Sequence, residues 1–238
     1  MARGTQARMP HLGRDRSIFA PQTGFWLQNC AQQKGEVMDP VPYASSPCQM
    51  AEDAETRRDV MRWRKAERAR LIAARQALPV AQRQKAEAAI VQALAEERGK
   101  IIGIYWPFKG EPDLRAWATA RRAEGARIAL PVVVEKAAPL VFREWLPGAE
   151  LARGIWNIPI PAEGAAVLHP DLIIAAVVGA DTQGYRLGYG GGYYDRTIEA
   201  LRLAGHAPRL IGIGFAAQAI PTIFPLPHDI ALHRLILA

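Results

Sequence analysis

The sequence is poor in cysteine and contains no long apolar run. Only two of its 238 residues are cysteines, Cys30 and Cys48, which are too few for a disulfide framework and make the reducing cytoplasm the simplest expected location. A helix that crosses a membrane needs about 20 consecutive, mainly apolar residues, and no stretch of this chain approaches that length. The sequence therefore predicts a protein without a membrane span.

An excess of one charge sign is also missing from most of the chain. The formal net charge is +7, of which +6 lies in residues 61–100, with none in residues 1–60 and +1 in the remainder. A basic protein is a candidate for binding nucleic acid. Here the excess is a local feature, and no aromatic residues interleave the basic ones. We therefore expect no nucleic-acid partner. The nucleic-acid alternative predicts binding that weakens steeply with salt.

Residues 1–50 show neither helical nor strand periodicity and contain five prolines. Their arginines resemble those of a transit peptide, but no amphipathic apolar stripe accompanies them. We interpret the segment as a disordered tail, or as an upstream start chosen in error, because Met50 and Met61 offer later starts. The expected organisation is an N-terminal extension at 1–58 followed by a single domain at 59–238.

From residue 59 onward, helical stretches alternate with apolar runs typical of buried strands. Pro79 ends the first helix, because a proline disfavours helix in the residue before it. The alternation predicts an α/β fold with an open, mostly parallel sheet flanked by helices in three layers. The expected helices are 60–77, 80–98, 113–124 and one running from the glycine-rich segment to 204, and the expected strands are 101–106, 127–134, 140–145, 172–178 and 210–215.

The segment 184–196, GYRLGYGGGYYDR, follows an expected strand and opens a helix, which is where open α/β sheets bind ligands. Glycines let backbone N–H groups surround a phosphate, and the helix dipole adds to the attraction. Arg186 and Arg196 can add charge-assisted hydrogen bonds, and Asp195 offers the oxygen ligands that Mg²⁺ prefers. No Gly-Lys-Ser/Thr follows, as a Walker loop requires, and Tyr193 stands where a dinucleotide fingerprint needs glycine.

The run RLGYGGGYYD at 186–195 closely resembles the signature of the 5-formyltetrahydrofolate cyclo-ligase family. The resemblance covers roughly residues 61–238 and continues, in the family's order, through YWPFKGE at 105–111, LPVV at 130–133, FREW at 142–145, WNIP at 156–159 and PHD at 227–229. It implies an enzyme that uses ATP and Mg²⁺ to close 5-formyltetrahydrofolate to 5,10-methenyltetrahydrofolate, releasing ADP and phosphate. We expect a cytoplasmic monomer; a preference for polyglutamylated substrate is left open.

The resemblance also implies which residues hold the nucleotide. Arg64, Lys65, Arg68 and Arg75 share one arc of the first helix, which in an arbitrary basic helix is usually a solvated face. Family members place basic residues of this helix on the ATP phosphates, at positions matching Arg68 and either Arg64 or Lys65. Arg186 and Tyr193 are the implied catalytic residues, and Asp195 is the implied metal ligand. The implied ATP-binding set is Arg64, Lys65, Arg68, Arg186, Leu187, Gly188, Tyr189, Gly190, Gly191, Gly192, Tyr193 and Tyr194.

The folate-binding residues implied by the resemblance are Trp106, Glu111, Tyr193 and Tyr194. A carboxylate such as Glu111 can accept two hydrogen bonds from the amino and N–H groups of a pterin. Trp106, like Phe108, offers either a flat apolar surface to the ring or ordinary core packing. Trp156 is similarly open between contact with adenine and a place in the core.

One departure from the family pattern concerns the metal. The family usually has an aspartate in a Pro-Leu-Asp segment after Pro-His-Asp, whereas this chain has His233 there, and Mg²⁺ prefers oxygen ligands. The alternative function is therefore a non-catalytic, or altered-activity, nucleotide- or folate-binding paralogue of the same family.

Overall fold

The computed structural model describes residues 47–238, with side chains described from residue 54 onward. Residues 47–238 form one compact α/β unit. Predictions that concern residues 1–46, including the tail, the resemblance to a transit peptide and Cys30, lie outside the described residues. None of the described helices is long and apolar enough to cross a membrane.

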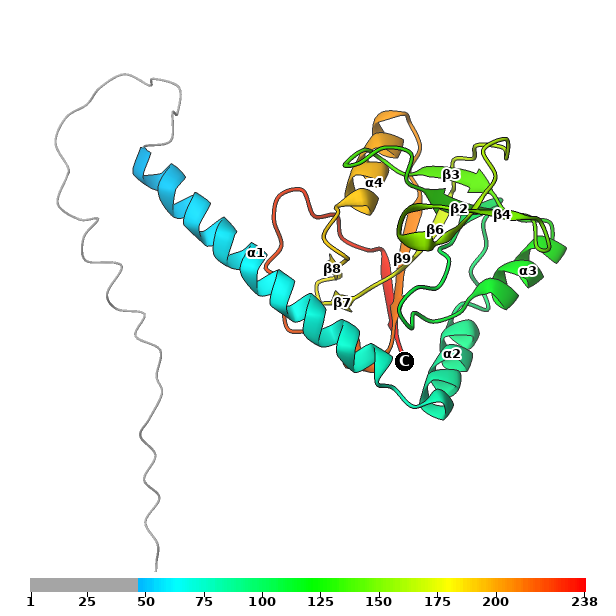
Figure 1. Ribbon diagram of the computed structural model, residues 1–238, viewed down its shortest axis with the longest axis horizontal. Helices are drawn as coiled ribbons and strands as arrows, with labels where there is room; N and C mark the ends of the chain where they lie inside the picture. Colours follow the sequence, from blue (N-terminus) through cyan, green and yellow to red (C-terminus); the bar gives the residue numbers. More distant parts are fainter. Residues whose placement is uncertain (1–46) are drawn as a thin grey trace, which may run out of the picture. The chain divides into compact units, whose positions relative to one another are not determined.

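The described chain alternates helices and strands, as its apolar pattern predicts (Figure 1). The α-helices are α1 (Pro47–Gln76), α2 (Val80–Ala93), α3 (Arg115–Ala123) and α4 (Tyr193–Leu203). The strands of the main sheet are β1 (Ile101–Gly103), β2 (Arg127–Val132), β3 (Val141–Glu144), β6 (Leu172–Ala176), β9 (Arg209–Gly214) and β10 (Arg234–Leu237). The smaller strands are β4 (Leu151–Arg153), β5 (Pro159–Pro161), β7 (Gly179–Ala180) and β8 (Arg186–Leu187).

The main sheet has the order β10-β9-β6-β1-β2-β3. Its strands are parallel except for the edge strand β3, which pairs antiparallel with β2. The central strands β6 and β9 are continuous apolar runs that are buried almost throughout, as expected where helices cover both faces of a parallel sheet. The predicted mostly parallel sheet is confirmed.

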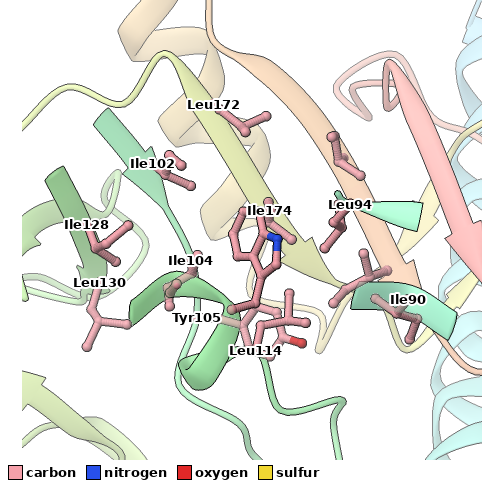
Figure 2. Close-up of a cluster of buried hydrophobic side chains, with 14 of the residues drawn as sticks. Ile90, Leu94, Ile102, Ile104, Tyr105, Leu114, Ile128, Leu130, Leu172 and Ile174 are labelled. Carbon is pink, nitrogen blue, oxygen red and sulfur yellow. The ribbon is translucent and has the colours of Figure 1, made fainter. Parts of the chain in front are cut away.

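Helices cover both faces of this sheet. Ile90 of α2 and Leu94, directly after that helix, pack with Leu114, directly before α3, and with the central strands in the largest buried cluster (Figure 2). On the opposite face, Ile198 and Leu201 of α4 pack in a second cluster with side chains of β2, β3, β6 and β9. The predicted three-layer arrangement is therefore confirmed.

Helix α1 packs beside the small β7–β8 hairpin through Leu71, which is fully buried. A Cβ on Gly179 would lie 2.7 Å from Cδ1 of Leu71, so only glycine allows this close approach of helix and strand. The packing brings the basic arc of α1 alongside the glycine-rich segment that follows β8.

Several element boundaries differ from the predictions. Helix α1 begins at Pro47 and not at 60, and β1 ends at Gly103 and not at 106, because the chain leaves the sheet there to form a wall of a cavity. The apolar pattern of the sequence did not predict β4, β5, β7, β8 or β10. Four of these have only two or three residues, which is too short a run for an alternating pattern to be recognised.

Candidate functional site

A cavity of about 430 Å³ opens at the carboxyl ends of the central strands. Its walls come from α1, from the segment after β1, from the end of β2, from the turn between β4 and β5, and from residues 186–195. In open α/β sheets this end of the strands is the usual place for a ligand. Every site residue that the family resemblance implies lines the cavity except Lys65, which is exposed on α1. Arg196, a further candidate for binding phosphate, does not line the cavity and donates to the carbonyl oxygen of Gly191.

The glycine segment reaches α4 through backbone conformations that favour glycine. Gly190 has φ +98° and Gly192 has φ +61°, in the left-handed region where other residues are strained. A Cβ on Gly191 would lie 2.6 Å from the ring of Tyr193. Gly192 is the N-cap residue of α4 and contributes no side-chain hydrogen bond. No side chain therefore caps the first N–H groups of α4, and an anion can accept from them.

Arg68 is the cation of α1 that bonds to the backbone of this segment. Its Nε donates to the carbonyl oxygen of Gly188 at 2.7 Å, and a Cβ on Gly190 would lie 3.4 Å from its Nη1. Burial and the neighbouring charge of Arg64 lower the pKa of Arg68, but a guanidinium stays charged at neutral pH. Arg68 can therefore offer its terminal N–H groups to a phosphate, as the resemblance implies.

Arg64 is already engaged with the protein. Its Nε donates to the carbonyl oxygen of Ile223 at 2.9 Å, and its Nη2 donates to the carbonyl oxygen of Phe224 at 2.8 Å. The remaining contacts are with Asp229, at 3.2 and 2.5 Å. Arg64 lines the cavity but spends four hydrogen bonds on the protein. The sequence left Arg64 and Lys65 as alternatives for a second contact with phosphate. Arg64 lies in the cavity wall, where it bonds to the protein, and Lys65 lies outside the cavity.

The buried pair between Arg64 and Asp229 is expected to stabilise the fold. Replacing Asp229 by alanine leaves a buried guanidinium without its counter-charge, which costs about 3 kcal/mol of unfolding free energy. Urea denaturation would measure this loss. In the matched control, Asp59→Ala removes an exposed pair with Arg62 and should cost less than about 1 kcal/mol. Equal losses in the two variants would contradict a structural role for Asp229.

The Asp229 pair also gives the stability a pH dependence. Burial alone would raise the pKa of Asp229, but hydrogen bonds from Arg64 and from the N–H of Leu226, with the charge of Arg64, hold it below its ordinary value. A lowered folded-state pKa means that this stabilisation is present above the unfolded pKa and is lost as the pH falls through the folded pKa. The excess loss in Asp229→Ala should therefore shrink in acid.

Arg186 and Asp195, near the two ends of the glycine segment, form a second ion pair. Arg186 is buried, and it donates to the carbonyl oxygen of Ile230 and to Oδ1 of Asp195, both at 2.9 Å. The same Oδ1 accepts the N–H of Ile230 at 3.1 Å. Oδ2 of Asp195 accepts no hydrogen bond among the described residues. One free carboxylate oxygen fits the way in which Mg²⁺ is usually held, by one or two carboxylates together with substrate phosphates.

No cluster of three or more metal-ligating side chains occurs among the described residues. His233, the departure from the family pattern, does not line the cavity. Its Nδ1 instead accepts the backbone N–H of Leu210 at 2.9 Å. A lone pair used in this way cannot also bind a metal. In this fold the ring of His233, directly before β10, therefore bonds to the backbone of strand β9 and does not line the cavity that contains Asp195.

Glu111 is a buried carboxylate in the cavity wall. Its Oε2 accepts the N–H of Phe108 at 3.0 Å, and its Oε1 accepts the hydroxyl of Tyr189 at 2.9 Å. Burial raises the pKa of Glu111 to about 7, although the charge of Arg75 and these two hydrogen bonds oppose the rise. Each oxygen keeps a further lone pair, so Glu111 can accept hydrogen bonds from a ligand, as the resemblance implies.

Aromatic side chains complete the walls. Trp106 lines the cavity and also packs against the main core cluster and edge-on to Trp145, so its two proposed roles coexist. Tyr194 also lines the cavity, and its buried hydroxyl has no hydrogen-bond partner among the described residues. Phe108 contacts the ring of Tyr189, with centroids 5.8 Å apart.

Trp156 is not a core residue. It is 58% exposed, has φ +56°, and lies edge-on to Tyr193 with ring centroids 6.5 Å apart. It occupies the turn between β4 and β5 at the cavity mouth. The core alternative for Trp156 is therefore wrong, and contact with a ligand stays a prediction.

No sequence pattern predicted a role for Arg75 or Asp229. Arg75 was noted on the basic arc of α1, and Asp229 lies in the family-like segment at 227–229, yet neither pattern shows which buried group each would meet. The structure places Asp229 on Arg64 and Arg75 beside Glu111. Such pairs join positions more than 30 residues apart, which no local periodicity reports.

Comparison with known proteins finds the same family that the motifs resemble. A model described as the 5-formyltetrahydrofolate cyclo-ligase family matches residues 60–237. The chain is 26% identical over 160 residues to the 5-formyltetrahydrofolate cyclo-ligase of Haemophilus influenzae, which covers 63% of this chain and 84% of the relative. It is 31% identical over 143 residues to that of Mycolicibacterium smegmatis, which covers 56% of this chain and 71% of the relative.

Two solved structures share the fold. The 5,10-methenyltetrahydrofolate synthetase of Mycoplasma pneumoniae matches with a TM-score of 0.57 and 22% identity, over 73% of this chain and 97% of that one. The 5,10-methenyltetrahydrofolate synthetase of Aquifex aeolicus matches with a TM-score of 0.61 and 24% identity, over 73% of this chain and 89% of that one. These likenesses support the observed layer order and sheet.

Proposed function

The chain belongs to the 5-formyltetrahydrofolate cyclo-ligase family, and on that basis we infer that it closes 5-formyltetrahydrofolate to 5,10-methenyltetrahydrofolate with cleavage of ATP to ADP and phosphate. The observation that carries this function is the composition of one cavity. Its lining joins an anion-binding end, made by Arg68 and the start of α4, to a buried hydrogen-bond acceptor, Glu111. A triphosphate and a pterin need these two environments side by side.

At the nucleotide end, the backbone N–H groups of residues 190–194 and the guanidinium of Arg68 would hold the phosphates. Arg186 would orient Asp195 by their 2.9 Å hydrogen bond and add positive charge nearby. Asp195 would hold Mg²⁺ through its free oxygen, and the ion would supply neutralisation of phosphate charge. In phosphoryl transfer the protein contributes mainly positioning and charge stabilisation, and this set of residues does both.

At the folate end, Glu111 would accept hydrogen bonds from the pterin while Trp106 supplies a flat apolar wall. Tyr194, which also lines the cavity, would add its ring to this wall. Tyr193, which is at the first turn of α4 and lines the cavity, would lie between the two ligands. This arrangement fixes the formyl group against the terminal phosphate and excludes water from their contact.

The chemistry follows from the poor leaving ability of a formamide oxygen. The N5-formyl oxygen forms a bond to the γ-phosphorus as the bond from phosphorus to the β–γ bridging oxygen breaks, which releases ADP. N10 then bonds to the activated formyl carbon, N10 loses its proton, and the carbon–oxygen bond breaks with phosphate as the leaving group. No side-chain nucleophile is required, so the site needs positioning residues more than a catalytic cysteine or serine.

The direct test is turnover by the full chain of residues 1–238. With Mg-ATP and 5-formyltetrahydrofolate we expect the near-ultraviolet absorbance of the methenyl product to rise, with one phosphate released for each product formed. Omitting either substrate is the control. Folded protein that binds ATP but gives neither product nor phosphate would contradict the proposal and indicate the non-catalytic paralogue.

Four further predictions accompany the proposed function. Mg²⁺ as the metal, a monomeric state, a cytoplasmic location and the absence of a nucleic-acid partner stay predictions. The free oxygen of Asp195 supports the first of them.

A further inference from the structure

Three side chains from separate parts of the chain form a continuous contact behind the folate end of the cavity. Arg75, in the last turn of α1, is fully buried. Its Nη2 donates to the hydroxyl of Tyr189 at 2.5 Å, and that hydroxyl donates to Oε1 of Glu111 at 2.9 Å. Nη1 of Arg75 lies 3.8 Å from the same Glu111 oxygen. The glycine segment is thereby joined to the carboxylate of the folate end.

Arg75 is held firmly in this position. Its Nε donates to the carbonyl oxygen of Lys109 at 3.0 Å, and its Nη1 donates to the carbonyl oxygen of Val177 at 3.3 Å. These bonds fix the guanidinium plane between the segment after β1 and the end of β6. Because Arg75 can only donate, the hydroxyl of Tyr189 must accept a hydrogen bond from Arg75 and donate its own hydrogen bond to Glu111. The direction of the chain is therefore determined by chemistry.

Tyr189 is an unusual member of this chain because the residue is 39% exposed while its hydroxyl meets two buried groups. It lies between Gly188 and Gly190 in the segment that would surround the phosphates. A shift of that segment would therefore move the hydroxyl that is bonded to Glu111. Nothing else in the glycine segment contacts the Glu111 carboxylate by a hydrogen bond among the described residues.

We propose that Arg75 and Tyr189 are positioning residues that hold the Glu111 carboxylate as a hydrogen-bond acceptor for the folate ring. Because Tyr189 belongs to the glycine segment, the position of the carboxylate then depends on the position of that segment. The inference rests on the proposed function and deepens it. Neither residue needs to touch the reacting atoms, because both act through Glu111.

The charged and titratable groups around Glu111 support a pH dependence. Arg75 faces it from α1, Tyr189 from the glycine segment, Tyr194 from α4 and Tyr105 from the segment after β1. Burial raises the pKa of all three tyrosines, so they stay neutral and Arg75 is the cation of this group. The hydrogen bond from Tyr189 lowers the pKa of Glu111, so its removal should raise that pKa above about 7.

The decisive variant is Tyr189→Phe, which keeps the ring and removes only the hydroxyl. We expect KM for 5-formyltetrahydrofolate to rise about tenfold near neutral pH, with kcat at saturating folate and KM for ATP changed less than about twofold. The acid limb of kcat/KM should move to higher pH, so that the defect shrinks in alkaline buffer. The matched control is Tyr185→Phe, a half-buried tyrosine of the Leu71 cluster outside the cavity.

A double-mutant cycle separates positioning from a general structural effect. If Tyr189 acts through Glu111, Tyr189→Phe should weaken folate binding little further in a Glu111→Gln background, measured by calorimetry with 5-formyltetrahydrofolate. Losses that add in full would overturn the proposal. So would a Tyr189→Phe defect that is the same at every pH, or no defect at all.

Arg75 is tested with a conservative pair of variants. Arg75→Lys keeps the charge and should retain part of the folate affinity that Arg75→Met loses, with thermal melting used to confirm folding. If Arg75→Met does not fold, the Tyr189→Phe result still decides. Failure of the inference is distinct from failure of the proposed function. If the inference fails, the wild-type protein is active and Tyr189→Phe has the same folate kinetics. If the proposed function fails, the wild-type protein shows no turnover.

Discussion

Replacing Glu111 by glutamine is expected to lower kcat/KM for 5-formyltetrahydrofolate by about a hundredfold or more. The substitution preserves shape, but a buried amide offers one acceptor and two donors where the pterin requires acceptors. The N–H of Phe108 would keep the amide oxygen, which leaves an NH₂ group, with no lone pair for the pterin, at the Oε1 position beside Tyr189. Steady-state kinetics with varied folate and varied ATP would measure the effect, and KM for ATP should change little.

The control for Glu111→Gln is Glu163→Gln, an exposed carboxylate outside the cavity, for which we expect wild-type kinetics. A Glu111→Gln enzyme with wild-type folate kinetics would contradict the placement of the pterin against Glu111. A variant impaired equally in its use of ATP and folate would indicate a collapsed cavity, which a melting curve would reveal.

Glu111→Gln, which should lower activity, should not lower the stability of the folded protein in alkaline solution. Burial raises the pKa of Glu111 from its ordinary value of 4.5 to about 7, so the folded state binds this proton more tightly than the unfolded chain. The corresponding stability is fully present below the unfolded pKa and is lost as the pH rises through the folded pKa. Above about pH 8, Glu111→Gln should therefore be at least as stable to urea as the wild-type protein while it is far less active.

Replacing Arg68 by methionine is expected to raise KM for ATP by about ten- to a hundredfold. The aliphatic part of the side chain is kept, while the charge-assisted bonds to phosphate and the bond to the carbonyl oxygen of Gly188 are lost. KM for folate should change much less, because Arg68 contacts the glycine segment and not the Glu111 side of the cavity. ATP titration and steady-state kinetics would separate the two effects.

Two other cations of α1 serve as controls for Arg68→Met. Arg70 is exposed and paired with Glu67, so Arg70→Met should bind ATP normally. Lys65→Met tests the alternative that the sequence left open, and the exposed position of Lys65 outside the cavity predicts little effect. A larger loss in Lys65→Met than in Arg68→Met would show that the nucleotide lies along another face of α1.

The sequence was most informative where the chemistry is local. The run at 186–195 predicts a phosphate loop because glycines and a helix start are adjacent in the chain, and the structure places this run at the cavity. The apolar runs likewise predict the central strands within a few residues. Arg64 and Arg68 lie four residues apart on one arc of α1, so helical periodicity does not distinguish them. In the structure Arg64 bonds to Asp229, whereas Arg68 faces the glycine segment.

By itself, then, the sequence determined the fold class, the family and the glycine loop, because apolar periodicity and backbone freedom are properties of neighbouring residues. Only the tertiary structure decided which cations are free for a ligand, that His233 is occupied by the backbone of Leu210, and that Arg75, Tyr189 and Glu111 form one chain of contacts. The net charge of +6 in residues 61–100 suggested an anionic partner. Two of these cations, Arg64 and Arg75, are buried and paired with carboxylates of the protein itself, because a buried charge must be compensated wherever it lies.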